Sequence, residues 1–232
     1  MPRPAEATGV DDRADEPGSA AAARGDVQRF TGAEHWVHRS NAILFTICIV
    51  SAACLYFGPL AVAIGRRDLV KTIHVYAGIA LPVPLLLGWF ASTTFRDDVR
   101  RLSRFAPRDW EWLRRRDRRT ASLPVGKFNA GQKLNSAFTA GVIVVMLGTG
   151  LIMRFFGPFP LAWRTGATFV HDWLALTLLV VIAGHLFEAL RDPESMLGMR
   201  TGRVSRAWAR SHHPGWEAEL PGPGIDPPGD GD

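Results

Sequence analysis

Cysteine is scarce in this chain: there are two, Cys48 and Cys54, among 232 residues. They lie in one apolar stretch, about 240° apart around a helix, so they point in different directions. A disulfide framework is therefore excluded. The pattern Cys-x-x-Cys-His is also absent, which excludes a covalently attached haem.

Charge is absent from long stretches. The 27 Lys+Arg and 22 Asp+Glu residues crowd outside four apolar windows, whose only charged residue is Asp172. Each window reaches the roughly 20 residues that a helix needs to cross a bilayer. This split excludes an ordinary soluble domain and predicts an all-α integral membrane four-helix bundle. The windows are 40–65, 72–95, 134–153 and 165–187, and the spans are expected at about 36–64, 71–95, 132–154 and 165–190.

The two ends of the chain lack apolar segments. Residues 1–28 are rich in Ala, Gly, Pro and Asp and contain no apolar core of a cleavable signal peptide. We predict a disordered tail there and another over 214–232. The membrane domain is then 29–213.

Basic residues predict the orientation. With four spans, both tails and the central connector share one side of the membrane. The opposite connectors hold five of the 27 basic residues, whereas the segment 96–133 alone holds twelve. Positive charge stays inside, so we expect a multi-pass membrane protein with cytoplasmic N and C termini.

The central connector carries a basic run at 114–119. Such a run can bind nucleic acid, but in a membrane protein a cytoplasmic surface facing lipid head groups is the better interpretation, so no nucleic-acid partner is predicted. Trp110 and Trp112 follow Pro107 and predict a short helix in the membrane interface.

Histidines carry the functional signal. Ionisable side chains within spans are rare and are functional candidates, although a single one is more often a hydrogen-bond partner between helices. Two of them, His171 and His185, share one helix face because 14 residues fall about 40° short of four turns, with a rise of about 21 Å. Five histidines lie in or near the windows: His35, His38, His74, His171 and His185.

The topology predicts two histidine pairs at different depths. His38 begins the first span and His185 ends the fourth on the same side of the membrane. His74 and His171 begin their spans on the opposite side. His35 is an alternative to His38, one turn away, but it lies farther from the apolar window.

Paired imidazoles limit the choice of metal. A structural zinc would need four ligands, whereas a six-coordinate haem iron takes two axial nitrogens and transfers electrons. Gly78 and Gly184 lie near the predicted ligands, where a flat macrocycle could approach the backbone or two helices could pack. We therefore predict two b-type haems.

The segment 126–133, Gly-Lys-Phe-Asn-Ala-Gly-Gln-Lys, resembles a signature of the cytochrome b (gamma) subunit of quinone-linked formate dehydrogenases, within the four-helix di-haem cytochromes b. The resemblance covers about 33–219. It includes the helix-four histidine spacing and the tail from Gly202 through Trp208 to Pro214 and Trp216.

The segment from Glu34 to His38 resembles the family's pattern around its first haem ligand. This resemblance implies that His38 is the ligand and that His35 stands where the family has arginine. Two positions differ from the family: Arg39 stands where Trp usually follows the ligand, and Asp172 stands where the family is apolar. We expect Asp172 to face outward. His212 and His213 are expected on the surface.

The resemblance implies a respiratory electron-transfer subunit. A molybdenum or tungsten catalytic subunit outside the cytoplasm would pass electrons through an iron–sulfur subunit to the haem of His74 and His171. The electrons would then pass to the haem held by His38 and His185 and reduce a quinone on the cytoplasmic side. The proposed quinone rim is Asn129, Gly131 and Gln132, whose amides suit a carbonyl; Lys133 could supply charge or protons, or the stretch could serve only as a helix start.

Two alternatives stay open from the sequence. The same cytochrome could serve a hydrogenase or a thiosulfate or polysulfide reductase. A different class is a haem-free membrane anchor, or a transporter whose histidines relay protons.

Overall fold

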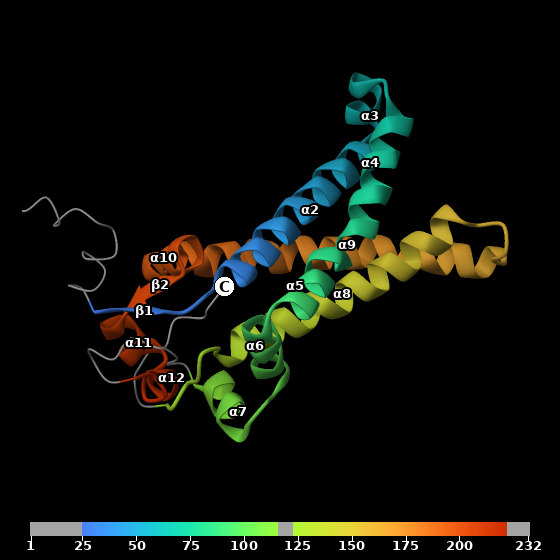
Figure 1. The fold of residues 1–232 in the computed structure, drawn as a ribbon. Helices are drawn as coiled ribbons and strands as arrows, with labels where there is room; N and C mark the ends of the chain where they lie inside the picture. Colours follow the sequence, from blue (N-terminus) through green and yellow to red (C-terminus); the bar gives the residue numbers. More distant parts are fainter. Residues whose placement is uncertain (1–24, 116–122, 222–232) are drawn as a thin grey trace, which may run out of the picture.

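The computed structural model describes residues 25–115 and 123–221. Two helical hairpins diverge from a small assembly at one end of the molecule (Figure 1). The first pairs α2 (Gly32–Tyr56) with α4 (Arg67–Ala80), and the second pairs α8 (Ala130–Arg154) with α9 (Leu161–Leu190). Helix α5 (Pro82–Ala91) continues α4.

Four helices are long and apolar enough to cross a membrane: Gly32–Tyr56, Arg67–Ala91, Ala130–Arg154 and Leu161–Leu190. Only 6% to 22% of their apolar windows is buried within the chain, so most of the apolar surface faces outward, as a bilayer requires. The predicted all-α membrane four-helix bundle is confirmed.

Proline and glycine set the span limits. The first span ends at Tyr56 instead of near 64, because Pro59 starts a separate short helix, α3 (Gly58–Ile64), which ends at Gly65 with φ of 64°. Pro82 divides the second span into α4 and α5, since proline lacks the N–H that would continue the helix. That span ends at Ala91, before Ser92 caps α6 (Thr93–Ser103).

The connector between the hairpins contains α6 and α7 (Pro107–Arg114). Helix α7 is the short helix predicted after Pro107, and Trp110 on it is 55% exposed. Within the basic run, residues 116–119 lie outside the described residues.

A collar closes the end of the bundle where the described chain begins and ends (Figure 1). It is the assembly of β1 (Asp26–Gln28), α10 (Pro193–Thr201), β2 (Arg203–Ser205), α11 (Arg206–His212) and α12 (Pro214–Glu217), and the two strands pair antiparallel. Its core contains Val204, Trp208, Ala209 and Trp216.

The collar corrects the predicted tail limits. The disordered segment predicted over 1–28 includes a strand, β1, at Asp26–Gln28. The one predicted over 214–232 begins with a helix, α12, at Pro214–Glu217. Trp216 is 5% exposed, so its burial outweighs the polar composition around it. The remaining tail residues, 1–24 and 222–232, lie outside the described residues.

His213 is buried, which overturns its predicted surface position. It is 2% exposed, and its Nδ1 donates to the Gly126 carbonyl at 2.7 Å. Its Nε2 accepts from Arg29 Nη2 at 3.2 Å. Burial, followed by the charge of Arg29, lowers the pKa of His213 to about 3. The neutral ring therefore ties Arg29, the residue after β1, to the segment that leads into α8.

Arg29 is the buried centre of the collar. It is 2% exposed, its Nη2 donates to the Lys127 carbonyl at 3.1 Å, and its guanidinium lies 4.6 Å from the Trp208 ring centroid. Burial lowers the pKa of Arg29 to about 10, against the opposing effect of nearby acidic residues. The side chain remains cationic and stacks on aromatic faces.

Candidate functional site

The structure brings the predicted histidines together as two pairs. The rings of His38 on α2 and His185 on α9 have centroids 6.5 Å apart. The rings of His74 on α4 and His171 on α9 have centroids 6.3 Å apart. We call these the near pair, toward the collar, and the far pair. Helix α9 contributes one imidazole to each, about 21 Å apart along its axis.

The ring separations fit a metal held between two imidazoles. A bond from imidazole nitrogen to a first-row metal is about 2.0 Å, as with zinc, and the ring centroid lies about 1.1 Å beyond that nitrogen. Two rings on opposite sides of one metal therefore have centroids about 6 Å apart. Both observed separations are close to this value, so the residues fit a bis-imidazole haem.

Additional ligands are missing from both positions. Across 25–115 and 123–221, no group of three or more His, Cys, Asp or Glu side chains is arranged to hold a metal. Two imidazoles without a third or fourth side chain do not make a structural zinc site. A Cβ placed on Gly78 or Gly184 would meet no atom within 4 Å, so neither glycine is in a tight contact between helices.

In the far pair, hydrogen bonds fix the state of His74. Its Nδ1 lies 3.2 Å from the Cys48 carbonyl and 2.9 Å from Ser51 Oγ. The Ser51 hydroxyl hydrogen is directed to the Ile47 carbonyl at 2.6 Å, so Ser51 accepts from the ring. Nδ1 therefore carries the proton, and Nε2 keeps a lone pair for a metal.

His171 has the same arrangement on α9. Its Nδ1 lies 2.9 Å from Thr149 Oγ1, whose hydrogen is directed to the Val145 carbonyl at 2.8 Å. Nδ1 again donates, and Nε2 is free. Gly150 makes the close approach of α8 possible, since its position lies 3.5 Å, measured to an added Cβ, from His171 Cε1.

The near pair lacks such partners. In the far pair, each ring Nδ1 donates to a hydroxyl. Among the described residues, no hydroxyl accepts such a hydrogen bond from the ring of His38 or His185. His35 has a different environment: its Nε2 donates to the Gly198 carbonyl at 3.2 Å, and its ring packs on Phe30. The structure thus turns His35 toward the collar and His38 toward His185.

The predicted quinone rim lies at the start of α8. Asn129 Oδ1 accepts from the Gln132 backbone N–H at 2.9 Å, and Gln132 Oε1 accepts from the Asn129 N–H at 3.0 Å. This capping box uses both side-chain oxygens, so the two NH₂ groups remain as donors. The rim is therefore a helix start that also presents amide donors.

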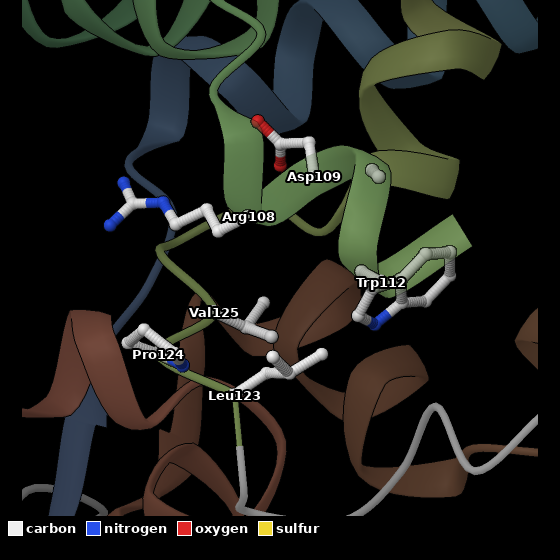
Figure 2. A pocket seen from close by; sticks show the side chains of 7 residues that line it. Arg108, Asp109, Trp112, Leu123, Pro124 and Val125 are labelled. Atoms are coloured by element: carbon white, nitrogen blue, oxygen red, sulfur yellow. The ribbon is translucent and has the colours of Figure 1, made fainter. Parts of the chain in front are cut away.

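Gly131 lies against α7. An added Cβ would lie 3.3 Å from Asn129 Oδ1 and 3.3 Å from Trp112 Cη2, so a larger side chain would crowd the rim. A small hollow beside it, drawn in Figure 2, is lined by Arg108, Asp109, Trp112, Leu123, Pro124, Val125 and Ala130.

Lys133 and Asp172 also have defined positions. Lys133 is 7% exposed and its Nζ lies 2.8 Å from Asp109 Oδ2, so its charge is neutralised and it anchors α7 on α8. Asp172 is exposed, as predicted, and it directly follows His171 of the far pair in the sequence.

Sequence reasoning did not find Ser51 and Thr149, nor a buried group of Glu34, Asp98 and Lys127. The signal for the hydroxyls was present, because each is a polar residue within an apolar window. Whether such a hydroxyl reaches an imidazole depends on how the helices pack, and the spacing of residues in the sequence does not reveal that packing.

Together the four spans and the imidazole pairs define a class: a membrane cytochrome b that transfers electrons. Comparison with known sequences agrees. A profile of the prokaryotic cytochrome b561 family matches residues 29–202, three-quarters of the chain. The chain belongs to the prokaryotic cytochrome b561 family.

Named relatives give a narrower resemblance. The cytochrome b556(Fdn) subunit of nitrate-inducible formate dehydrogenase from Escherichia coli K12 is 29% identical over 196 residues, covering 80% of this chain and 86% of that protein. The E. coli K12 formate dehydrogenase cytochrome b556(fdo) subunit is 27% identical over 212 residues, covering 85% and 94%. The cytochrome b556 subunit of Haemophilus influenzae formate dehydrogenase is 27% identical over 195 residues, covering 80% and 78%. The resemblance predicted from the sequence is confirmed.

Proposed function

We propose that this chain is the membrane cytochrome b subunit of a quinone-linked formate dehydrogenase. It would carry electrons from an extracytoplasmic catalytic subunit to a quinone that is reduced on the cytoplasmic side. The observation that carries the proposal is the presentation by α9 of one imidazole to each pair, with ring centroids 6.5 and 6.3 Å apart.

We assign the haem ligands to these pairs. His38 and His185 would hold one haem b, and His74 and His171 the other. Bis-imidazole haem supplies one-electron transfer without an open coordination position. The chain's own part is to hold the imidazoles across from each other and, in the far pair, to direct each Nδ1–H at a hydroxyl, which would leave Nε2 available as the ligand atom.

The distribution of charge supports an orientation for the proposal. The collar and the connector 96–133 carry most basic residues, which supports a cytoplasmic collar with cytoplasmic N and C termini. The near pair and the amides of Asn129 and Gln132 would then lie toward the cytoplasm, where a reduced quinone takes up its two protons. Separating outer oxidation from inner proton uptake would build a membrane potential, and moving one charge across that potential is worth roughly 2.3 kcal/mol per 100 mV.

The partners are inferred from the relatives, which are formate dehydrogenase subunits. We propose a molybdenum or tungsten catalytic subunit and an iron–sulfur subunit on the outer face. The protein would work in the bacterial plasma membrane as a multi-pass electron-transfer subunit of the oxidoreductase.

The direct test is to purify the intact complex and measure its haem and its chemistry. We expect two haem b per chain, reduction of both by formate, and reoxidation by added quinone. One haem per chain, or haem that formate cannot reduce, would overturn the assignment. Mass spectrometry of the co-purifying subunits separates formate dehydrogenase from a hydrogenase or a sulfur-compound reductase.

A further inference from the structure

Two buried carboxyl groups meet where the collar joins the bundle. Glu34, in the first turn of α2, is 8% exposed, and Asp98, on α6, is 5% exposed. They lie within hydrogen-bonding reach of each other. They are separated by 64 positions in the sequence, so only the tertiary structure brings them together.

The donors around the two groups leave one oxygen without a partner. Glu34 Oε2 accepts from the backbone N–H of Thr31 and from Thr31 Oγ1, the latter at 2.6 Å. Asp98 Oδ2 accepts from Lys127 Nζ at 2.5 Å. Glu34 Oε1 is buried with no hydrogen-bond donor among the described residues.

A proton held between the carboxyl groups satisfies that oxygen. Two ionised carboxylates in contact repel each other, whereas one proton turns the contact into a hydrogen bond. Burial and the neighbouring Glu34 raise the pKa of Asp98 to about 6, while Lys127 acts in the opposite direction. Asp98 in turn raises the pKa of Arg29 against the effect of burial.

The position of this carboxyl pair connects it with the proposed site. Glu34 lies one helical turn before His38, a rise of about 6 Å. Lys127, which holds Asp98, lies two residues before Asn129 of the quinone rim. Lys133, the other ammonium near the rim, is neutralised by Asp109.

We propose that Glu34 and Asp98 share and supply a proton for quinone reduction. The inference rests on the proposed function. Reduction of a quinone to a quinol consumes two electrons, which arrive through the cytochrome, and two protons. The pair releases its shared proton toward the rim, which leaves both carboxylates ionised beside Lys127 and Arg29. A proton from cytoplasmic water then restores the pair, and a second round of release and restoration delivers the second proton of the reduction. The pair acts through the rim and is a positioning element, not a group in contact with substrate.

Glu34→Gln and Asp98→Asn test this proposal, because each amide reproduces the hydrogen bond of the protonated group and cannot release the proton. Asp97→Asn is the matched control, since Asp97 is the next residue on α6 and its side chain is 63% exposed. Glu34→Gln also leaves the Asp98–Lys127 ion pair intact, so it remains informative if Asp98→Asn folds poorly.

The first readout does not depend on activity. Infrared titration of the purified wild-type chain should show a protonated-carboxyl band that disappears as the pH rises through about 6. The band should be missing in both test variants and present in Asp97→Asn. A band unchanged in Glu34→Gln and Asp98→Asn would overturn the proposal.

The second readout is the pH profile of quinol formation by the intact complex. The wild-type rate should increase as the pH falls toward 6. Both test variants should lose that increase, and their rate of quinol formation should fall on the order of tenfold or more. Their haem content should be unchanged. Wild-type rates and profiles in both would refute the proton role. Failure of the wild type to reduce quinone would instead overturn the proposed function, and the infrared titration would still show whether the pair holds a proton.

Discussion

The two histidine pairs share a ligand type and a ring separation but differ in their support. In the far pair, Ser51 and Thr149 each accept from a ring Nδ1 at 2.9 Å. In the near pair, the described residues supply no such hydrogen bond, and α2 is instead fixed by the contact of His35 with the collar. One pair is oriented by side-chain chemistry and the other by packing.

This difference has an electrostatic consequence. A hydrogen bond from Nδ1 makes an imidazole a more basic ligand, and a more basic ligand favours the oxidised iron. The far haem should therefore have the lower reduction potential. Electrons would move downhill from the far pair to the near pair, the direction that quinone reduction beside the collar requires.

The largest effect should come from removing ligands. His74→Ala and His171→Ala should each abolish the far haem, and His38→Ala and His185→Ala the near one, because six-coordinate iron needs both nitrogens. Haem quantification and reduced-minus-oxidised spectra of the purified chain measure this. His35→Ala is the control and should keep two haems; if it loses one while His38→Ala keeps both, the assignment on α2 is wrong.

Acid should weaken the collar before it weakens the bundle. The pKa of His213 falls from 6.5 to about 3 on folding, so the folded state holds the ring neutral. Its contribution is complete above the unfolded pKa of 6.5 and is lost as the pH drops toward 3. We expect the free energy of collar unfolding to fall by a few kcal/mol across that window. The fluorescence of Trp208 and Trp216, which lie in the collar core, reports the unfolding.

The controls for this titration are adjacent in the sequence. His213→Gln should flatten the acid dependence of collar unfolding, whereas His212→Gln should leave it in place, because His212 is only partly buried. An unchanged titration in His213→Gln would show that another group causes the transition.

Gly202→Ala should affect the near pair through the collar. Gly202 has φ of 82°, and an added Cβ would lie 2.6 Å from the Phe30 carbonyl and 3.2 Å from His35 Cε1. We expect about 1–3 kcal/mol of destabilisation and preferential loss of the near haem on mild heating. Gly65→Ala is the comparison, since φ there is 64° but no atom lies within 4 Å. Equal loss of both haems in Gly202→Ala would contradict local support by the collar.

The smallest effect is expected at the hydroxyls. Ser51→Ala and Thr149→Val should raise the potential of the far haem by tens of millivolts, since about 59 mV corresponds to a tenfold change for one electron, and should leave the near haem unchanged. Potentiometric titration resolves the two. Thr46→Val on α2 and Thr177→Val on α9 remove exposed hydroxyls that bond only to their own helices, and should have no effect.

Local patterns predicted several elements well. The absence of charge marked all four spans, and the period of the α-helix aligned His171 with His185. The span limits were less predictable, because Pro59 and Pro82 interrupt apolar runs without changing their hydropathy. The tails were assigned from composition, which does not reveal that Trp216 would be buried against Trp208.

The sequence by itself determined the membrane bundle, the family and the residues available as ligands, because these depend on hydropathy, helical period and motif. Tertiary structure decided what the side chains contact. It directed His35 to the collar, placed Ser51 and Thr149 against the far imidazoles, buried His213 and brought Glu34 to Asp98. Each of these contacts joins segments distant in the chain, and their geometry depends on how helices pack against one another, which no local pattern encodes.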